Sequence, residues 1–267
     1  MSSNVLRVMA WSALISAGAI GCGGGDHNSL PSRGPDGGPG TGMSYSGGHG
    51  LAFYHLNTSH AGTISTPGMT VQPSGSTILV SIGHGGKSLI AAPTDNQGNQ
   101  PYVQQDTMHT YTLYPDSGTA LYTFQNAKGG DNFQVTTTTG LAPESGQYDE
   151  VTIAAVEVAA SGKIQQVVWD EVPGGSDPVI SKSVTTNGPA TLVSFWWGDG
   201  FYPVPQQVSA NNDFTIIDTN VKEQDSFVQC AVAVKAVTAP GTYDVTWTGG
   251  STDGTPEGGQ VWLIAIE

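Results

Sequence analysis

Three blocks of the sequence recur in the same order in the second half of the chain, and this repetition constrains the fold more than any other feature. The blocks pair FQVTTT at residues 133–138 with YDVTWT at 243–248, IAAVE at 153–157 with LIAIE at 263–267, and residues 71–82 with 184–195. The first two pairs share an offset of 110 (243 − 133 and 267 − 157), and the third has an offset of 113 (184 − 71). Chance similarity between Val-, Thr- and Ala-rich segments is the alternative, but the shared order favours duplication of one unit.

Composition and turn spacing indicate that this unit is a β-structure. Only 11% of the residues are charged, against about 25% in typical proteins, and 37 of the 267 residues are Gly. Such a composition favours short strands joined by many turns over helices. In the second unit the strand candidates are residues 179–185, 190–197, 204–208, 214–218, 227–236, 242–248 and 260–266. We therefore predict an all-β protein with two tandem β-sandwiches, at residues 44–158 and 159–267.

The segment PGTYDV at residues 240–245 resembles the tyrosine corner of immunoglobulin-like sandwiches. In those domains a Tyr hydroxyl bonds back to the backbone a few residues upstream. The resemblance implies that each unit is an immunoglobulin-like sandwich. The period of a strand also places Tyr243, Val245 and Trp247 on one face. The alternative architecture is a single jelly-roll-like sandwich built from both halves.

The amino-terminal segment is typical of an exported lipoprotein. Residues 1–21 read as a signal peptide whose apolar stretch is too short to span a bilayer. The sequence Ala19-Ile20-Gly21-Cys22 resembles the bacterial lipobox, which implies lipidation of Cys22 and, because Gly23 rather than Asp follows, sorting to the outer membrane or cell surface. Residues 22–43 lack apolar periodicity and predict a flexible tether. An ordinary signal peptide with an incidental Cys is the alternative.

Charge and motifs exclude several classes of function. The net charge of −14 disfavours nucleic acid as a partner. The segment GHGGKS at residues 83–88 has Ser81 where the phosphate-binding loop pattern needs Gly, so it predicts a Gly-rich turn. The chain contains no G-x-S-x-G motif and no His pair at helical metal-binding spacing. Cys230, the one Cys left after processing, lies in an apolar run and is predicted to be a small buried residue.

The segment WWGDGFYP at residues 196–203 is the best candidate for a binding site. Alternation along a strand puts Trp196 and Trp197 on opposite faces, so one packs in the core and the other lies near the following loop. In an immunoglobulin-like sandwich this loop shares one end with residues 249–258. Aromatic rings stack on sugars, and carboxylates accept hydrogen bonds from sugar hydroxyls. The candidate ligand-binding residues are therefore Trp197, Asp199, Phe201, Tyr202, Asp253 and Glu257, with core-capping aromatics and solvated acids as the alternative.

Two further sets of polar residues are open to two interpretations each. Asp95, Asn96 and Asn99 either form an Asx-type turn or bind Ca²⁺, which is the one cofactor that the sequence suggests. Glu157 and Glu267 occupy equivalent positions in the repeat. They are either exposed at strand ends or form a buried, hydrogen-bonded carboxylate that recurs in both units.

These features favour a non-catalytic, lipid-anchored binding or adhesion protein of the cell envelope. Its lipid would contact the membrane, and its ligand would be a polysaccharide or another surface protein. A secreted carbohydrate-active hydrolase with two loop carboxylates roughly 5–10 Å apart is one alternative. A structural envelope component that assembles through strand edges is the other.

Overall fold

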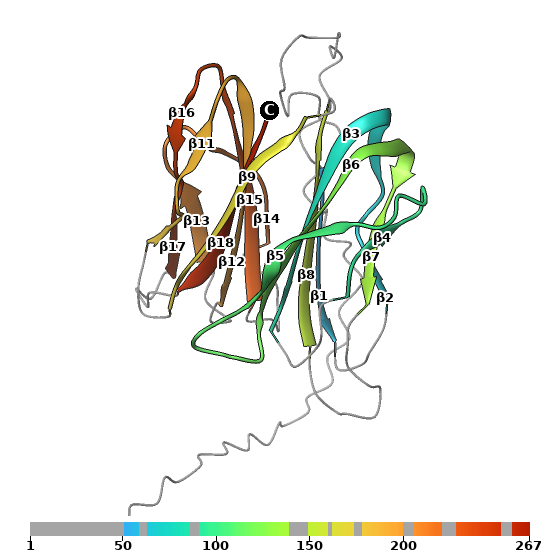
Figure 1. The fold of residues 1–267 in the computed structure, drawn as a ribbon. Helices are drawn as coiled ribbons and strands as arrows, with labels where there is room; N and C mark the ends of the chain where they lie inside the picture. The colour runs from blue at the N-terminus through green and yellow to red at the C-terminus, as the bar shows by residue number, and fades with distance from the viewer. Residues whose placement is uncertain are drawn as a thin grey trace, which may run out of the picture. The chain divides into compact units, whose positions relative to one another are not determined.

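The computed structural model describes the backbone of Leu51–Thr58 and residues 63–85, 91–138, 149–159, 162–173, 178–199, 206–220, 228–251 and 258–267 (Figure 1). The regular elements in these ranges are all β-strands, which confirms the predicted all-β class. No helix in the described ranges is long and apolar enough to cross a membrane. The predicted signal peptide, the lipobox with Cys22 and the tether at residues 22–43 lie outside the described residues, so they stay predictions.

The described strands of the first half form two antiparallel sheets. The strands are β1 (Leu51–Thr58), β2 (Thr63–Ser65), β3 (Met69–His84), β4 (Thr94–Asp95), β5 (Val103–Thr110), β6 (Gly118–Phe133), β7 (Val135–Thr138) and β8 (Asp149–Val158). A five-stranded sheet has the order β1-β8-β3-β6-β5, and a three-stranded sheet has the order β2-β7-β4. Figure 1 shows these strands in blue to yellow-green.

The described strands of the second half form a similar five-stranded sheet and three-stranded sheet. They are β9 (Ile164–Val172), β10 (Val179–Ile180), β11 (Val184–Thr186), β12 (Ala190–Asp199), β13 (Gln206–Ala210), β14 (Thr215–Asn220), β15 (Val228–Val237), β16 (Gly241–Tyr243), β17 (Thr246–Ser251) and β18 (Gly259–Ile266). Their sheets are β14-β15-β12-β18-β9 and β10-β17-β13, with β11 paired to β16. The pair β11 and β12 corresponds to the single strand β3, and β15 with β16 corresponds to β6.

Once these correspondences are made, the strand order is identical in the two halves. The order β1-β8-β3-β6-β5 becomes β9-β18-β12-β15-β14, and β2-β7-β4 becomes β10-β17-β13. In the described residues no strand of the first half pairs with a strand of the second. This is the arrangement expected if one unit was duplicated.

The pairing within each half follows that of a rolled-up hairpin. The first strand pairs with the last, the second with the second-last and the third with the sixth, as β1·β8, β2·β7 and β3·β6 show. In an immunoglobulin sandwich the first two strands are neighbours in one sheet, whereas here β1 and β2 lie in different sheets. The strand order is therefore that of a jelly roll in each half. It differs both from the immunoglobulin-like order and from one jelly roll spanning both halves.

Each half has its own apolar core between its large and small sheets. In the first half this core includes Ile64 of β2, Ile82 of β3 and Val135 of β7. In the second it includes Trp196 of β12 and Trp247 of β17, which stack with ring centroids 6.4 Å apart. The predicted common face of residues 243, 245 and 247 is confirmed, since all three contact this core.

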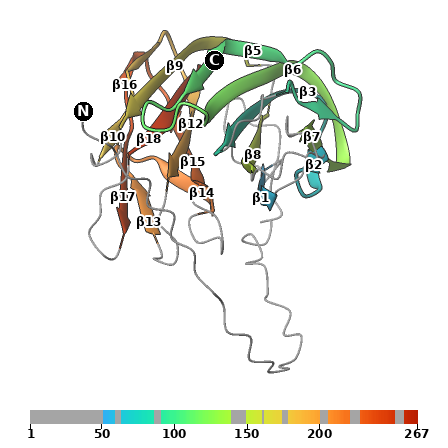
Figure 2. The ribbon, with the colours of Figure 1, turned by 90° about the horizontal axis from the view of Figure 1, so that it is seen from below.

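A third apolar cluster joins the two five-stranded sheets, and we call this contact the seam. Leu79, Leu121 and Val156 of the first half pack there with residues of the second half such as Phe195 and Trp262. All five are at most 3% exposed. The large sheets are therefore covered on both faces, one face by their own small sheet and the other by each other. Figure 2 shows the same strands seen from below.

The carboxylates at equivalent ends of the two halves recur as hydrogen-bond acceptors. Glu157 is 2% exposed, and its Oε1 accepts hydrogen bonds from the Gln72 N–H at 2.8 Å and the Ser76 hydroxyl. Glu267 Oε1 accepts from the backbone N–H groups of Asn187 at 2.5 Å and Gly188 at 2.9 Å. Each carboxylate thus holds the equivalent turn of its own half. The buried interpretation is correct for Glu157, whereas Glu267 is half-buried.

Candidate functional site

Strand register brings several strand ends of both halves, near His84, Gly118, Gly198 and Gly259, to one end of the protein, which we call the loop end. In the first half, His84 at the end of β3 pairs with Gly118 and Val151 at the starts of β6 and β8. In the second half, Gly198 near the end of β12 pairs with Gly259 at the start of β18. The two ends meet, because a Cβ built on Gly83 would lie 2.4 Å from Cδ1 of Trp197.

The predicted ligand-binding residues are only partly within the described structure. The strands that flank the two predicted loops are paired, as Gln206↔Ser251 and Gly198↔Gly259 show, so the strand ends on both sides of these loops lie at the loop end. Asp199 ends β12, and nothing is described of its side chain. Phe201, Tyr202, Asp253 and Glu257 lie outside the described residues.

Trp197 occupies a different position from the one expected. Its side chain is 3% exposed and packs with Tyr111 and Cys230. A buried ring offers no face to a ligand, so its expected role in ligand stacking is wrong for this structure. Alternation did place it correctly on the face opposite Trp196; that face is covered by the first half.

A chain of three aromatic rings runs from Trp197 to the surface, and we call it the aromatic chain. Tyr111 is fully buried and meets the Trp197 ring edge-on, with centroids 5.7 Å apart and an interplanar angle of 82°. Tyr114 follows, with its ring centroid 6.1 Å from that of Tyr111, and is 52% exposed. Its neighbour Leu113 is 50% exposed. The outer end of the aromatic chain is therefore an exposed ring in the loop between β5 and β6.

This loop, residues 111–117, is closed by its own backbone and braced by the second half. The N–H of Tyr111 donates to the carbonyl of Ser117 at 2.9 Å, and the N–H of Ser117 donates to the carbonyl of Tyr114 at 2.8 Å. The N–H of Thr112 donates across the seam to both carboxylate oxygens of Glu171, at 3.1 Å each. The exposed ring is thus carried by a well-fixed loop.

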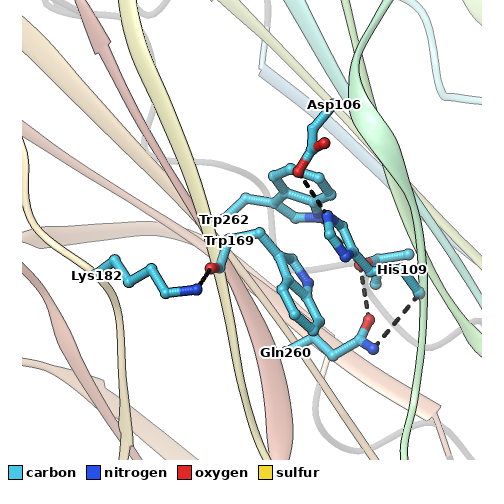
Figure 3. A network of polar contacts seen from close by, with 7 residues as sticks. Asp106, His109, Trp169, Lys182, Gln260 and Trp262 are labelled. Carbon is cyan, nitrogen blue, oxygen red and sulfur yellow. Dashed lines mark hydrogen bonds and ion pairs between the residues drawn. The ribbon is translucent and has the colours of Figure 1, made fainter.

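Polar and aromatic side chains lock the seam beneath the loop (Figure 3). The imidazole of His109 stacks on the indole of Trp169, with centroids 3.9 Å apart and planes 5° apart, and lies 3.0 Å from the Asp106 carboxylate. The indole N–H of Trp262 donates to the Thr119 hydroxyl at 3.0 Å, and that hydroxyl donates to Gln260 at 2.7 Å. These contacts join β5 and β6 of the first half to β9 and β18 of the second.

The residues proposed as Ca²⁺ ligands are engaged by the protein itself. Asp95 accepts hydrogen bonds from the N–H groups of Gln97 and Asn99 and from the Tyr102 hydroxyl, at 2.8, 3.1 and 2.7 Å. Burial, followed by this bond to Asp95, raises the pKa of Tyr102 well above its usual value. Asn96 and Asn99 hydrogen-bond backbone groups on β6 and beside β7. This geometry is that of an Asx-type turn; a Ca²⁺ ion there stays an untested prediction.

The remaining titratable groups of the described ranges matter here as possible metal ligands and for their shifted pKa values. No group of three or more His, Cys, Asp or Glu side chains in those ranges could hold a metal ion. Cys230 is buried as predicted, and burial raises the pKa of its thiol while a hydrogen bond with Thr152 opposes the shift. Burial raises the pKa of Asp218 to about 6, against the lowering effect of the Thr219 N–H.

Sequence reasoning missed Tyr111, Tyr114 and Trp169, and it considered His109 only as one of several His residues that could gather around a metal, not as a contact between the halves. The segment MHTYTLYP at residues 108–115 gives no clear signal of a site, because its Tyr residues fit a plain strand-and-turn pattern. One signal was present: Leu113 and Tyr114 adjoin Pro115-Asp116, a turn dipeptide, and large apolar residues at a turn are poorly placed for burial.

No family model, curated protein or solved structure matches the chain.

Proposed function

We propose that this protein is a non-catalytic, lipid-anchored binding or adhesion protein of the cell envelope, which contacts its ligand through the loop end. Its ligand is a polysaccharide or another surface protein. Cys22 holds it at the outer membrane or cell surface, and residues 22–43 form the tether. The chain begins with features of an export signal, and its acidic balance of −14 disfavours adhesion to anionic lipid or nucleic acid.

The observation that carries the binding role is the exposed end of the aromatic chain. Tyr114 is 52% exposed although the two aromatic rings behind it, Tyr111 and Trp197, are at most 3% exposed. An amphipathic ring held on a fixed loop binds with a low cost in conformational entropy. This arrangement supports binding at the loop end more than it supports catalysis.

Two measurements test the proposal. In a bacterium that processes lipoproteins, the full chain should incorporate labelled fatty acid and fractionate with the outer membrane, and Cys22→Ser should abolish both. Residues 34–267, which include the whole compact unit, should bind envelope polysaccharide or a surface protein in a pull-down assay. An unlabelled wild-type chain would refute the anchor. Turnover of a polysaccharide without stable binding would favour the hydrolase instead.

A further inference from the structure

We propose that residues 111–117 form a contact site for neutral polysaccharide, in which the Tyr114 ring stacks on the apolar face of a sugar. This inference rests on the proposed binding function and narrows it to one ligand class and one site. It uses only the described residues of the loop between β5 and β6 and of β9.

Tyr114 stands apart from the other exposed apolar side chains. In the described ranges, the other large apolar residues that are about half exposed are Leu113 beside it, Val103 on β5 and Ile180 on β10. Val103 and Ile180 are aliphatic strand residues. Tyr114 alone in this set offers an aromatic face, which suits the C–H groups on one side of a pyranose ring.

The loop that carries the Tyr114 ring is fixed by contacts within the protein. Its loop is closed by the hydrogen bonds between Tyr111 and Ser117 and between Ser117 and Tyr114. The Tyr111 ring packs against it from behind, and Glu171 holds the Thr112 N–H from the second half. Ordering a loop on binding weakens affinity, so a loop already fixed at both its base and its flank favours binding.

The charge near the loop selects among ligand classes. The loop itself holds Asp116, Glu171 of β9 contacts it, and residues 91–127 contain no Lys or Arg. Lys182 also reaches β9, where its ammonium donates to the Trp169 carbonyl at 3.1 Å. The loop and the side chain that contacts it are therefore acidic, with one cation bound to the same strand. Such a surface repels phosphorylated or uronic-acid polymers and anionic membranes. Carboxylates accept hydrogen bonds from sugar hydroxyls, so an aromatic face bordered by acids suits an uncharged sugar. A basic peptide is the other class that this charge permits, and the experiment below separates the two.

The experiment measures binding of residues 34–267 to a glycan array and to insoluble cellulose and mannan, with polylysine as the basic probe. The variants are Tyr114→Ala, Tyr114→Phe and, as the matched control for an exposed apolar residue elsewhere, Ile180→Ala. We expect binding to neutral glycans that Tyr114→Ala weakens roughly three- to tenfold, while Tyr114→Phe and Ile180→Ala stay close to wild type. Unchanged melting temperatures would show that each variant is folded.

Two outcomes overturn the inference. The first is binding to polylysine but to none of the neutral glycans. The second is neutral-glycan binding that Tyr114→Ala leaves unchanged, which would move the site elsewhere. Either result leaves the proposed function standing if the chain still captures a surface partner. Failure to bind any glycan, basic probe or surface protein would refute both.

Discussion

Removing the Glu157 carboxylate tests whether the repeated turn is held as the structure indicates. Glu157→Ala deletes the acceptor of two hydrogen bonds, from the Gln72 N–H and the Ser76 hydroxyl, at a site where Glu157 is 2% exposed. A buried donor left without a partner costs about 1–3 kcal/mol, which applies to the Ser76 hydroxyl, and the half-buried Gln72 N–H adds about 1 kcal/mol, so the expected loss of unfolding free energy is about 2–4 kcal/mol. For a domain of this size that lowers Tm by roughly 10 °C.

The equivalent variant in the second half should be milder. Glu267→Ala also frees two N–H groups, but Asn187 is exposed and water can replace the lost acceptor. We expect a loss of about 1 kcal/mol. Thermal unfolding followed by circular dichroism measures both, with Asp131→Ala as a control that removes one exposed carboxylate from β6, the strand that pairs with β3. If Glu157→Ala is no more destabilising than Asp131→Ala, the carboxylate does not hold the turn.

Three further predictions concern the seam. Burial raises the pKa of Asp218 from 3.8 to about 6, so between these pH values the folded state binds more protons than the unfolded state, and stability falls as the pH rises through them. Asp218→Asn should therefore stabilise the protein at pH 7 but not at about pH 4, as measured by urea unfolding. Equal effects at both pH values would refute the argument. Gly83→Ala places a methyl group 2.4 Å from a Trp197 ring atom and should cost about 1–3 kcal/mol by the same assay, whereas Gly188→Ala, with no atom within 4 Å, should stay within about 0.5 kcal/mol. The buried Cys230 thiol should react with Ellman's reagent only after unfolding, and rapid reaction of the native protein would contradict its position in the seam.

Local patterns predicted most strands of the second half. The expected strand at residues 190–197 is β12 (Ala190–Asp199), and 260–266 is β18 (Gly259–Ile266). The strand β9 was missed because IQQVVWDEV is a partly exposed edge strand with two consecutive Gln residues, which lacks clear alternation. Alternation and turn spacing depend on short segments only, and the strands predicted from them are the part of the fold that was predicted correctly.

Long-range arrangement could not be predicted in the same way. The hydroxyl of Tyr243 does donate to the Ala239 carbonyl at 2.9 Å, as the tyrosine-corner resemblance implied. A corner is a local contact, however, and does not determine that the first strand pairs with the last.

The burial of Trp197 could not be predicted from local patterns either, because the residues that bury it belong to the first half. One sequence signal of the seam was present. VWLIAI in β18 is apolar on both faces, which is typical of a strand that is covered on both sides.

The central claim is that the two jelly rolls fold as one body because their large sheets bury each other in the seam. Equilibrium urea unfolding of residues 34–267 tests this directly when it is followed both by Trp fluorescence and by far-ultraviolet circular dichroism. All Trp residues of this segment lie in the second half, and Trp169, Trp197 and Trp262 among them contact the first half, so the fluorescence reports the seam and the second half, whereas the circular dichroism reports the strands of both halves. We predict a single transition with coincident midpoints in the two signals. Two separated transitions in the circular dichroism signal would show that the halves unfold independently and would contradict the account.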